Sequence, residues 1–331
     1  MLKKIMKGFL LLLFLLLSAA SLKFILIGKD LKIDELAIFL TKSENSKGIR
    51  LTYLGCAGFI IEYKNSSILC DPYISNPSLY NFGNEHADWS KYVAEDKLNS
   101  IDLVTISHGH YDHCYDMESL CSYIRPNSKI VGDVSVQNQL NVIYKNQNLQ
   151  RINLDFNNTQ EWIYDASNKF RVLPLPSIHS PHIGHYEFFK GSYTSPLPAS
   201  PPYFWNWKKG NDYSYLVDIL DDDSIVYRIA LINGNLNGAS MDVLRKISKE
   251  RTSDLQLQIF WKEELVAENM LAVYEIIHPT QIILQHWNNF FRNNNKTLQY
   301  LRSSNLPKVL KKYNNEDIPV SFMLPFRDVT F

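Results

Sequence analysis

The sequence predicts an α+β fold built as one sizeable domain, and two observations support this. Residues 101–107 are mostly apolar and β-branched, as in a strand covered on both faces, and apolar residues then recur at helical spacing over 117–124. Of the 331 residues, 45% are hydrophobic and 13% aromatic, which is ample for a core, and no internal repeat interrupts them. We therefore expect one domain over residues 48–331, preceded by a linker over 29–47.

The most informative motif directly follows this strand and reads His108-Gly109-His110-Tyr111-Asp112-His113. His108 and His110 lie two residues apart in extended backbone, so their imidazoles project to the same side. Both can then reach one ion at the roughly 2.0–2.1 Å that zinc–nitrogen bonds require. Asp112 and His113 are expected in the turn between strand and helix. A histidine-rich surface loop or helix-capping histidines are the alternatives, but the apolar strand before the motif favours a metal site.

Segments on both sides of the motif resemble the metallo-β-lactamase superfamily. Residues 51–62 and 68–73 resemble the paired opening strands of that family, 176–180 its next metal-binding strand end, and 279–287 its last. The resemblance spans about residues 48–292 and is nearest to the branch of N-acyl-phosphatidylethanolamine phospholipase D and sugar-phosphate lactonases. It implies an αββα four-layer metallo-β-lactamase sandwich.

The resemblance also implies a set of metal ligands. A first metal is assigned to His108, His110 and His179, and a second to Asp112, His113 and His286. The family usually bridges its two ions with an Asp, but Asn235 follows the strand at 225–232 here. An amide oxygen is a weaker ligand than a carboxylate, so the number of ions, one or two, is open.

The other histidines and the cysteines are assigned to structural roles. His182 and His185 compete with His179, which is preferred because it alone follows an apolar strand. His86 and His278 are interpreted as surface or loop residues. Cys56, Cys70 and Cys121 are interpreted as core thiols. Cys114 follows His113 and is interpreted as a bystander, with a position near the metal as the alternative.

The ligands point to hydrolysis. A dication held by three neutral imidazoles lowers the pKa of bound water toward neutrality and polarises an electrophile. Asp112 would orient the nucleophilic water or accept its proton. Zinc suits the histidine-rich set best, while manganese or iron would be compatible with the oxygen ligands. Redox diiron members of the family favour a glutamate where this chain has His110.

An aromatic segment follows His179. Four prolines within residues 193–207 exclude a regular helix or central strand there. The segment ends in four aromatic residues, which are too apolar for a loop that is simply exposed to solvent: Tyr203, Phe204, Trp205 and Trp207. Two interpretations are open: a hydrophobic substrate wall or membrane contact, or a cover over the core.

The N-terminal residues 1–28 are interpreted as a targeting segment. Lys3, Lys4 and Lys7 precede an apolar run over 8–17 and small residues at 18–20. Apolarity continues to residue 28, so a cleaved signal peptide and an uncleaved membrane anchor are both open. Both interpretations predict export, with the domain in the periplasm or anchored to the inner membrane and facing outside the cytoplasm.

Three function classes are compatible with these features. The first is a metal-dependent hydrolase acting on an ester, lactone or phosphodiester of a small-molecule or lipid-like substrate. The second is a degenerate member that binds through one structural metal with little catalysis. The third is a membrane-associated lipid phosphodiesterase. The formal net charge is zero, which argues against a nucleic-acid partner, and the oligomeric state is open.

Overall fold

The structure is a computed structural model that describes residues 7–8, 13, 28–43, 47–77, 82–83, 86–157, 161–182, 185–260 and 263–331. The predicted targeting segment, residues 1–28, lies almost wholly outside these ranges. Within the described part of the chain, no helix is long and apolar enough to span a bilayer.

The first sheet has seven strands and contains the predicted opening strands and the strand before the histidine motif. Strands β2, β3 and β4 form an antiparallel meander, and β5, β6 and β7 continue from β4 in parallel. Its order is β17 (Arg327–Thr330), β2 (Ile49–Gly55), β3 (Gly58–Tyr63), β4 (Ser66–Cys70), β5 (Ile101–Thr105), β6 (Lys129–Asp133) and β7 (Gln150–Leu154).

The second sheet has eight strands and contains the other two predicted strand ends. It joins an antiparallel half, β9 to β11, to a parallel half, β11 to β16. Its order is β12 (Asn235–Leu236), β9 (Phe170–Ile178), β10 (Asp212–Asp221), β11 (Ser224–Ile232), β13 (Leu255–Ile259), β14 (Gln281–Gln285) and β16 (Val320–Phe322), while β8 (Ile163–Tyr164) pairs with β9.

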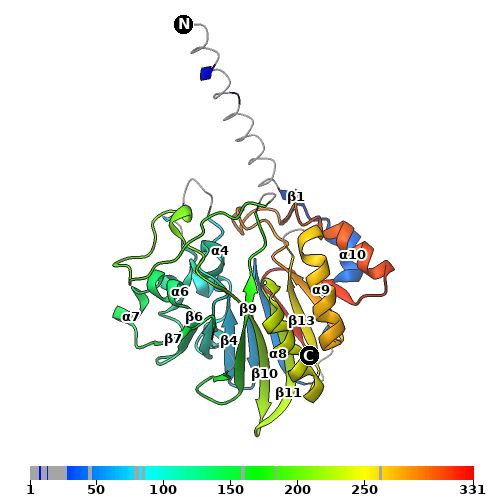
Figure 1. The fold of residues 1–331 in the computed structure, drawn as a ribbon, viewed down its shortest axis with the longest axis horizontal. Helices are drawn as coiled ribbons and strands as arrows, with labels where there is room; N and C mark the ends of the chain where they lie inside the picture. The colour runs from blue at the N-terminus through cyan, green and yellow to red at the C-terminus, as the bar shows by residue number, and fades with distance from the viewer. Residues whose placement is uncertain are drawn as a thin grey trace.

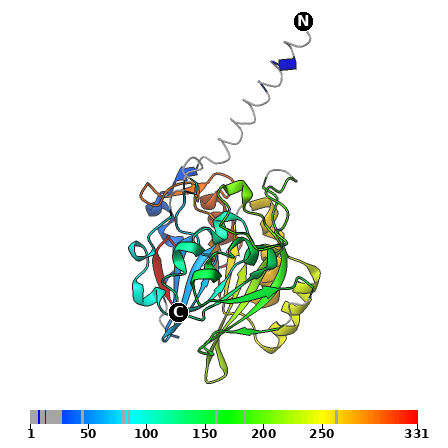
Figure 2. The same cartoon turned by 90° about the vertical axis from the view of Figure 1, so that its left-hand side faces the viewer.

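Helices cover the outer faces of both sheets (Figures 1 and 2). The longer α8 (Gly238–Glu250) and α9 (Glu263–Ile277) lie on the side of the second sheet. Short helices lie on the other side: α3 (Glu95–Leu98), α4 (Tyr111–Cys114), α5 (Met117–Leu120), α6 (Val134–Gln139) and α7 (Ile143–Asn146). The last helix, α10 (Leu306–Asn315), packs near β16.

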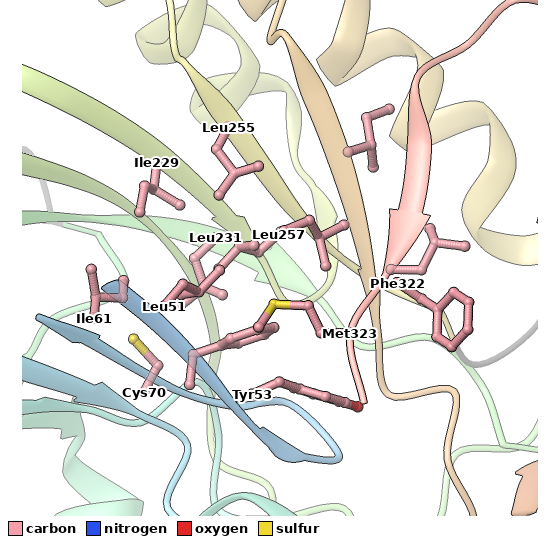
Figure 3. Packing of buried hydrophobic residues seen from close by; sticks show 14 of the residues in the cluster. Leu51, Tyr53, Ile61, Cys70, Ile229, Leu231, Leu255, Leu257, Phe322 and Met323 are labelled. Carbon is pink, nitrogen blue, oxygen red and sulfur yellow. The ribbon is translucent and has the colours of Figure 1, made fainter. Parts of the chain in front are cut away.

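Three hydrophobic clusters fill the three spaces between these layers. Between the sheets, Leu51 and Ile61 of the first sheet face Leu231 and Leu257 of the second (Figure 3). A second cluster joins Val104 and Ile106 to the short helices, and a third joins Leu216 and Ala230 to α8 and α9. Burial on both faces of each sheet explains why the strands read as continuous apolar runs. The predicted αββα four-layer sandwich is therefore confirmed.

Two local features differ from the sequence prediction. Residues 28–40 do not form a linker: β1 (Gly28–Asp30) pairs with β15 (Gln299–Leu301), and Leu31, Leu36 and Phe39 are buried in the cluster between the sheets. These apolar side chains can leave water only by packing onto the domain, which holds the segment in place. In addition, Asp112 and His113 lie on α4 rather than in a turn.

Candidate metal centre

The predicted ligands converge where strands from both sheets end. His108 and His110 follow β5, His179 immediately follows β9, and His286 immediately follows β14. Gly109 is required between the first two histidines, because a β-carbon there would overlap the Lys208 carbonyl and the Gln139 amide. Strand ends are rigid, so the four imidazoles are held in place by the sheets.

The first cluster consists of His108, His110 and His179, each with a ring nitrogen within 4.8 Å of the other two. Their ring centroids lie 4.6 to 4.9 Å apart, and the rings are close to perpendicular, with interplanar angles of 80 to 85°. Burial lowers the pKa of all three imidazoles, that of His110 to about 3, so they are neutral at physiological pH. Three neutral, converging imidazoles fit one divalent metal ion.

The second cluster contains Asp112, His113 and His286, as predicted, and also Cys56. Asp112 Oδ2 lies 3.3 Å from His286 Nε2 and 3.9 Å from His113 Nε2. Burial opposes ionisation of Asp112, but the surrounding histidines, His113 first, lower its pKa well below the ordinary value. Asp112 is therefore a carboxylate that faces two imidazoles, a donor set that also fits a divalent ion.

Two buried carboxylates that the sequence analysis missed contact His113 and His108 on the ring nitrogen that faces away from the clusters. Asp71 Oδ2 lies 2.9 Å from His113 Nδ1, and Asp212 Oδ1 lies 3.2 Å from His108 Nδ1. Each contact leaves Nε2 of the ring facing the cluster, which is how carboxylates orient metal-binding histidines. Asp71 directly follows the buried strand β4, and this polar residue at a strand end was the available signal.

A charged network continues from Asp212 to the third histidine. Lys209 Nζ lies 3.1 Å from Asp212 Oδ2 and 2.7 Å from Glu187 Oε1, while Glu187 Oε1 lies 3.9 Å from His179 Nδ1. Burial raises the pKa of Asp212 to about 7, although Lys209 opposes this. The network connects the supports of His108 and His179.

Asn235, the predicted substitute for the bridging Asp, begins β12 and pairs with Ile178, the residue before His179. Its role as a ligand stays a prediction. Asn233, two residues earlier, is buried, and its Nδ2 donates to Asp71 Oδ2 at 3.2 Å while its Oδ1 accepts from Gln285 Nε2 at 2.8 Å. Asn233 therefore supports the carboxylate that orients His113.

The remaining histidines, including the alternatives to His179 as a ligand, lie outside both clusters of ligand atoms. The His182 ring stacks on His179 at 4.9 Å and lies 5.4 Å from His110, beside the first cluster but not among its ligand atoms. His185, His86 and His278 are exposed. The Cys114 thiol lies 3.4 Å from the His110 carbonyl oxygen and is not part of either cluster.

The structure divides the aromatic segment into two parts. Trp207 is buried in the core and packs against Tyr115, so its prediction as a substrate-binding residue is wrong. It belongs to the hydrophobic cluster beneath the short helices, where burial of its large indole ring stabilises the fold. By contrast, Tyr203 and Trp205 are 51% and 47% exposed and stack on each other at 4.8 Å.

A continuous series of ring contacts leads from the first cluster to this exposed pair. Phe189 lies 6.1 Å from His110, and Phe204 lies 5.6 Å from Phe189. Phe204 in turn contacts Trp205 at 4.8 Å. A series of contacting aromatic rings therefore extends from His110 to the outside of the molecule.

Comparison with known proteins finds similarity over part of the chain to the superfamily that the motif resembles. Residues 50–185 match the family model described as a beta-lactamase superfamily domain. A metal-dependent hydrolase from Aeropyrum pernix is 33% identical over 25% of this chain and 29% of its own length. Another from Pyrococcus furiosus is 27% identical over 42% of this chain and 52% of its own length. The chain thus aligns with about half or less of each curated relative.

The fold is shared more widely than the sequence. A solved metallo hydrolase from Ignicoccus hospitalis superimposes with a TM-score of 0.53 and 19% identity, covering 86% of this chain and 98% of its own. At this identity the likeness shows the fold alone. In sequence, the match to the beta-lactamase superfamily domain is confined to residues 50–185.

Proposed function

We propose that this protein is a metal-dependent hydrolase whose substrate is an ester, lactone or phosphodiester with an apolar portion. The single observation that carries the proposal is the convergence of three neutral imidazoles, two buried and one partly buried, next to a carboxylate that belongs to a second ligand cluster. The curated relatives are named metal-dependent hydrolases, which supports the same reaction class.

His108, His110 and His179 would hold the first ion, and Asp112, His113 and His286 would contribute to a second. Zinc suits this donor set best. When bound, the metal supplies Lewis acidity and lowers the pKa of a coordinated water. Asp112 is an ionised carboxylate among the ligands, so it can accept a hydrogen bond from the attacking water and orient it. Asp71 and Asp212 hold His113 and His108 in the tautomers that direct Nε2 at the site.

The aromatic series from Phe189 to Trp205 supports an apolar portion of the substrate, since it begins at His110 and ends at the surface. Tyr203 and Trp205 are also suited to the interface of a membrane, where such rings concentrate. We further propose that the N-terminal segment exports the domain, so that this surface operates outside the cytoplasm.

Metal content and hydrolysis test the proposal together. Purified protein would be analysed for bound metal and assayed on a phosphodiester, a lactone and p-nitrophenyl esters of short and long acyl chains, before and after chelation. We expect metal-dependent hydrolysis with a preference for the acyl-bearing substrates. Metal-loaded protein that turns over none of them would instead support the non-catalytic metal-binding alternative.

A further inference from the structure

We propose that the Cys56 thiolate is a ligand of the second metal ion, completing a site with Asp112, His113 and His286. The inference rests on the proposed metal-dependent function. The sequence analysis interpreted Cys56 as a core thiol. Cys56 lies in the connection between β2 and β3, away in sequence from the three expected ligands.

The spacing of the side chains carries the proposal. Cys56 Sγ lies 3.8 Å from Asp112 Oδ2, and ligand atoms of all four residues lie within 4.8 Å of one another. Metal–ligand bonds of about 2.0–2.3 Å at tetrahedral angles separate neighbouring ligand atoms by roughly 3.3–3.7 Å. The contacts of Asp112 with Cys56, His113 and His286, at 3.8, 3.9 and 3.3 Å, are close to this spacing.

The backbone connects Cys56 directly to the segment that carries His286. The Cys56 carbonyl accepts hydrogen bonds from the His286 N–H at 2.5 Å and from the Tyr53 hydroxyl at 2.9 Å. The Cys56 N–H donates to Asn288 Oδ1 at 2.7 Å. Cys56 and His286 both adopt left-handed conformations, with φ of 49° and 62°. Such conformations disfavour residues other than glycine, and they occur where the surroundings fix them, often at functional sites.

A second buried polar group lies at the same place. The Tyr111 hydroxyl has no hydrogen-bond partner among the described residues, although its side chain is buried. Tyr111 directly precedes Asp112 on α4.

The charge of the site points to the same ligand. With Asn235 in place of the usual bridging Asp, Asp112 would be the one anionic ligand of the second ion. A thiolate adds a second negative charge beside the dication, and thiolates favour zinc over harder metals. As the sulfur–metal bond forms, the thiol proton is released to solvent.

Cobalt(II) substitution provides a test that does not depend on activity. The wild-type protein should bind two equivalents of cobalt and show a thiolate-to-cobalt charge-transfer band in the near ultraviolet. Cys56→Ser should lose the band and one equivalent, while the first site stays occupied. Cys114→Ser is the matched control, because this thiol is buried and adjoins His113 but lies outside the cluster; it should keep both the band and the stoichiometry.

Each outcome decides between the proposals. A band that persists in Cys56→Ser, or two equivalents without any band in the wild type, would overturn the thiolate ligand and leave the proposed function standing. Wild-type protein that binds no metal at all would overturn both. Should Cys56→Ser fail to fold by circular dichroism, serine variants of Cys70, Cys114 and Cys121 would decide. Retention of the band in all three assigns it to Cys56, and its loss in any one removes it from Cys56.

Discussion

Each side chain at the metal centre takes its charge from its immediate surroundings. Burial keeps His110 neutral, whereas His113 is held between the carboxylates of Asp71 and Asp112, which raise its pKa although burial opposes this. Two imidazoles in one hexapeptide are therefore tuned in opposite directions. The neutral one can serve as a ligand directly, and the other must release its proton to solvent when a metal ion binds.

Replacing His110 with Ala should abolish metal binding at the first cluster and hydrolysis with it, because the cluster loses one of its three nitrogen ligands. His278→Ala should leave both unchanged, since His278 is exposed and outside both clusters. Metal analysis of the two variants after dialysis checks this. Native metal content in His110→Ala would show that the first cluster is assigned incorrectly.

The metal-free protein should lose stability in mild acid because of His110. Its pKa is lowered from 6.5 to about 3 in the folded state, so the unfolded chain binds the proton first as the pH falls below 6.5. Between pH 8 and pH 5 this contribution destabilises the fold by about 2 kcal/mol. Urea unfolding should show that His110→Gln loses less stability than wild type over this range, and equal losses would contradict the shift.

Asn235→Asp should strengthen binding of the second ion if this position faces the site. An added carboxylate attracts a dication directly, and the expected gain is on the order of tenfold in affinity. Asn237→Asp is the control, because Asn237 caps α8 and an Asp there would cap it equally well. Unchanged affinity in a folded Asn235→Asp protein would mean that the bridging position lies elsewhere in this turn.

At the scale of elements, a buried ion pair joins neighbouring strands of the second sheet. Asp218 of β10 and Arg228 of β11 are register partners, and Arg228 Nε lies 2.5 Å from Asp218 Oδ1. Arg171 of β9 lies 2.8 Å from the same carboxylate. One buried carboxylate thus connects three adjacent strands.

Removing this carboxylate should be costly. Asp218→Ala leaves the buried Arg228 without its counter-ion, and we expect a loss of about 3–5 kcal/mol in the free energy of unfolding. Asp242→Ala removes the partner of Arg245 from an exposed pair and should cost less than about 1 kcal/mol. Denaturant unfolding of both variants measures the difference, and similar losses would contradict a structural role for the buried pair.

At the scale of the whole molecule, the exposed pair of Tyr203 and Trp205 lies at the far end of the ring series that begins at His110. A chain without residues 1–27 keeps β1 and should fold and bind metal. In this protein, replacing Tyr203 and Trp205 with Ala should weaken vesicle binding or raise KM for long-chain esters, with metal content unchanged. Trp207→Ala should instead destabilise the fold by about 3–5 kcal/mol, because it empties a buried site. Equal KM and vesicle binding in wild type and the double variant would remove the argument for an apolar substrate.

The apolar runs of the sequence predicted the central strands and where they end, and the motif and the family resemblance suggested most of the proposed ligands. Apolar runs indicated β5, β9 and β14. The spacing of His108 and His110 after β5 was enough to suggest metal binding, whereas His179 and His286 were suggested by the resemblance to the metallo-β-lactamase superfamily.

The residues that complete and support the candidate metal centre depend on how the two sheets pack. Cys56 lies between two opening strands and Asp212 begins β10, so nothing local distinguishes them from ordinary core or turn residues. Asp71 stands out as a polar residue at the end of β4, but the chain around it does not indicate that it contacts His113. They reach the histidines because the two sheets close against each other and bring distant strand ends together. The same packing buried Trp207 and left Trp205 at the surface, although the two are separated by a single residue. Contacts of this kind depend on which faces of the sheets and loops pack together. The pattern of apolar and polar residues along a single strand or loop does not specify this packing.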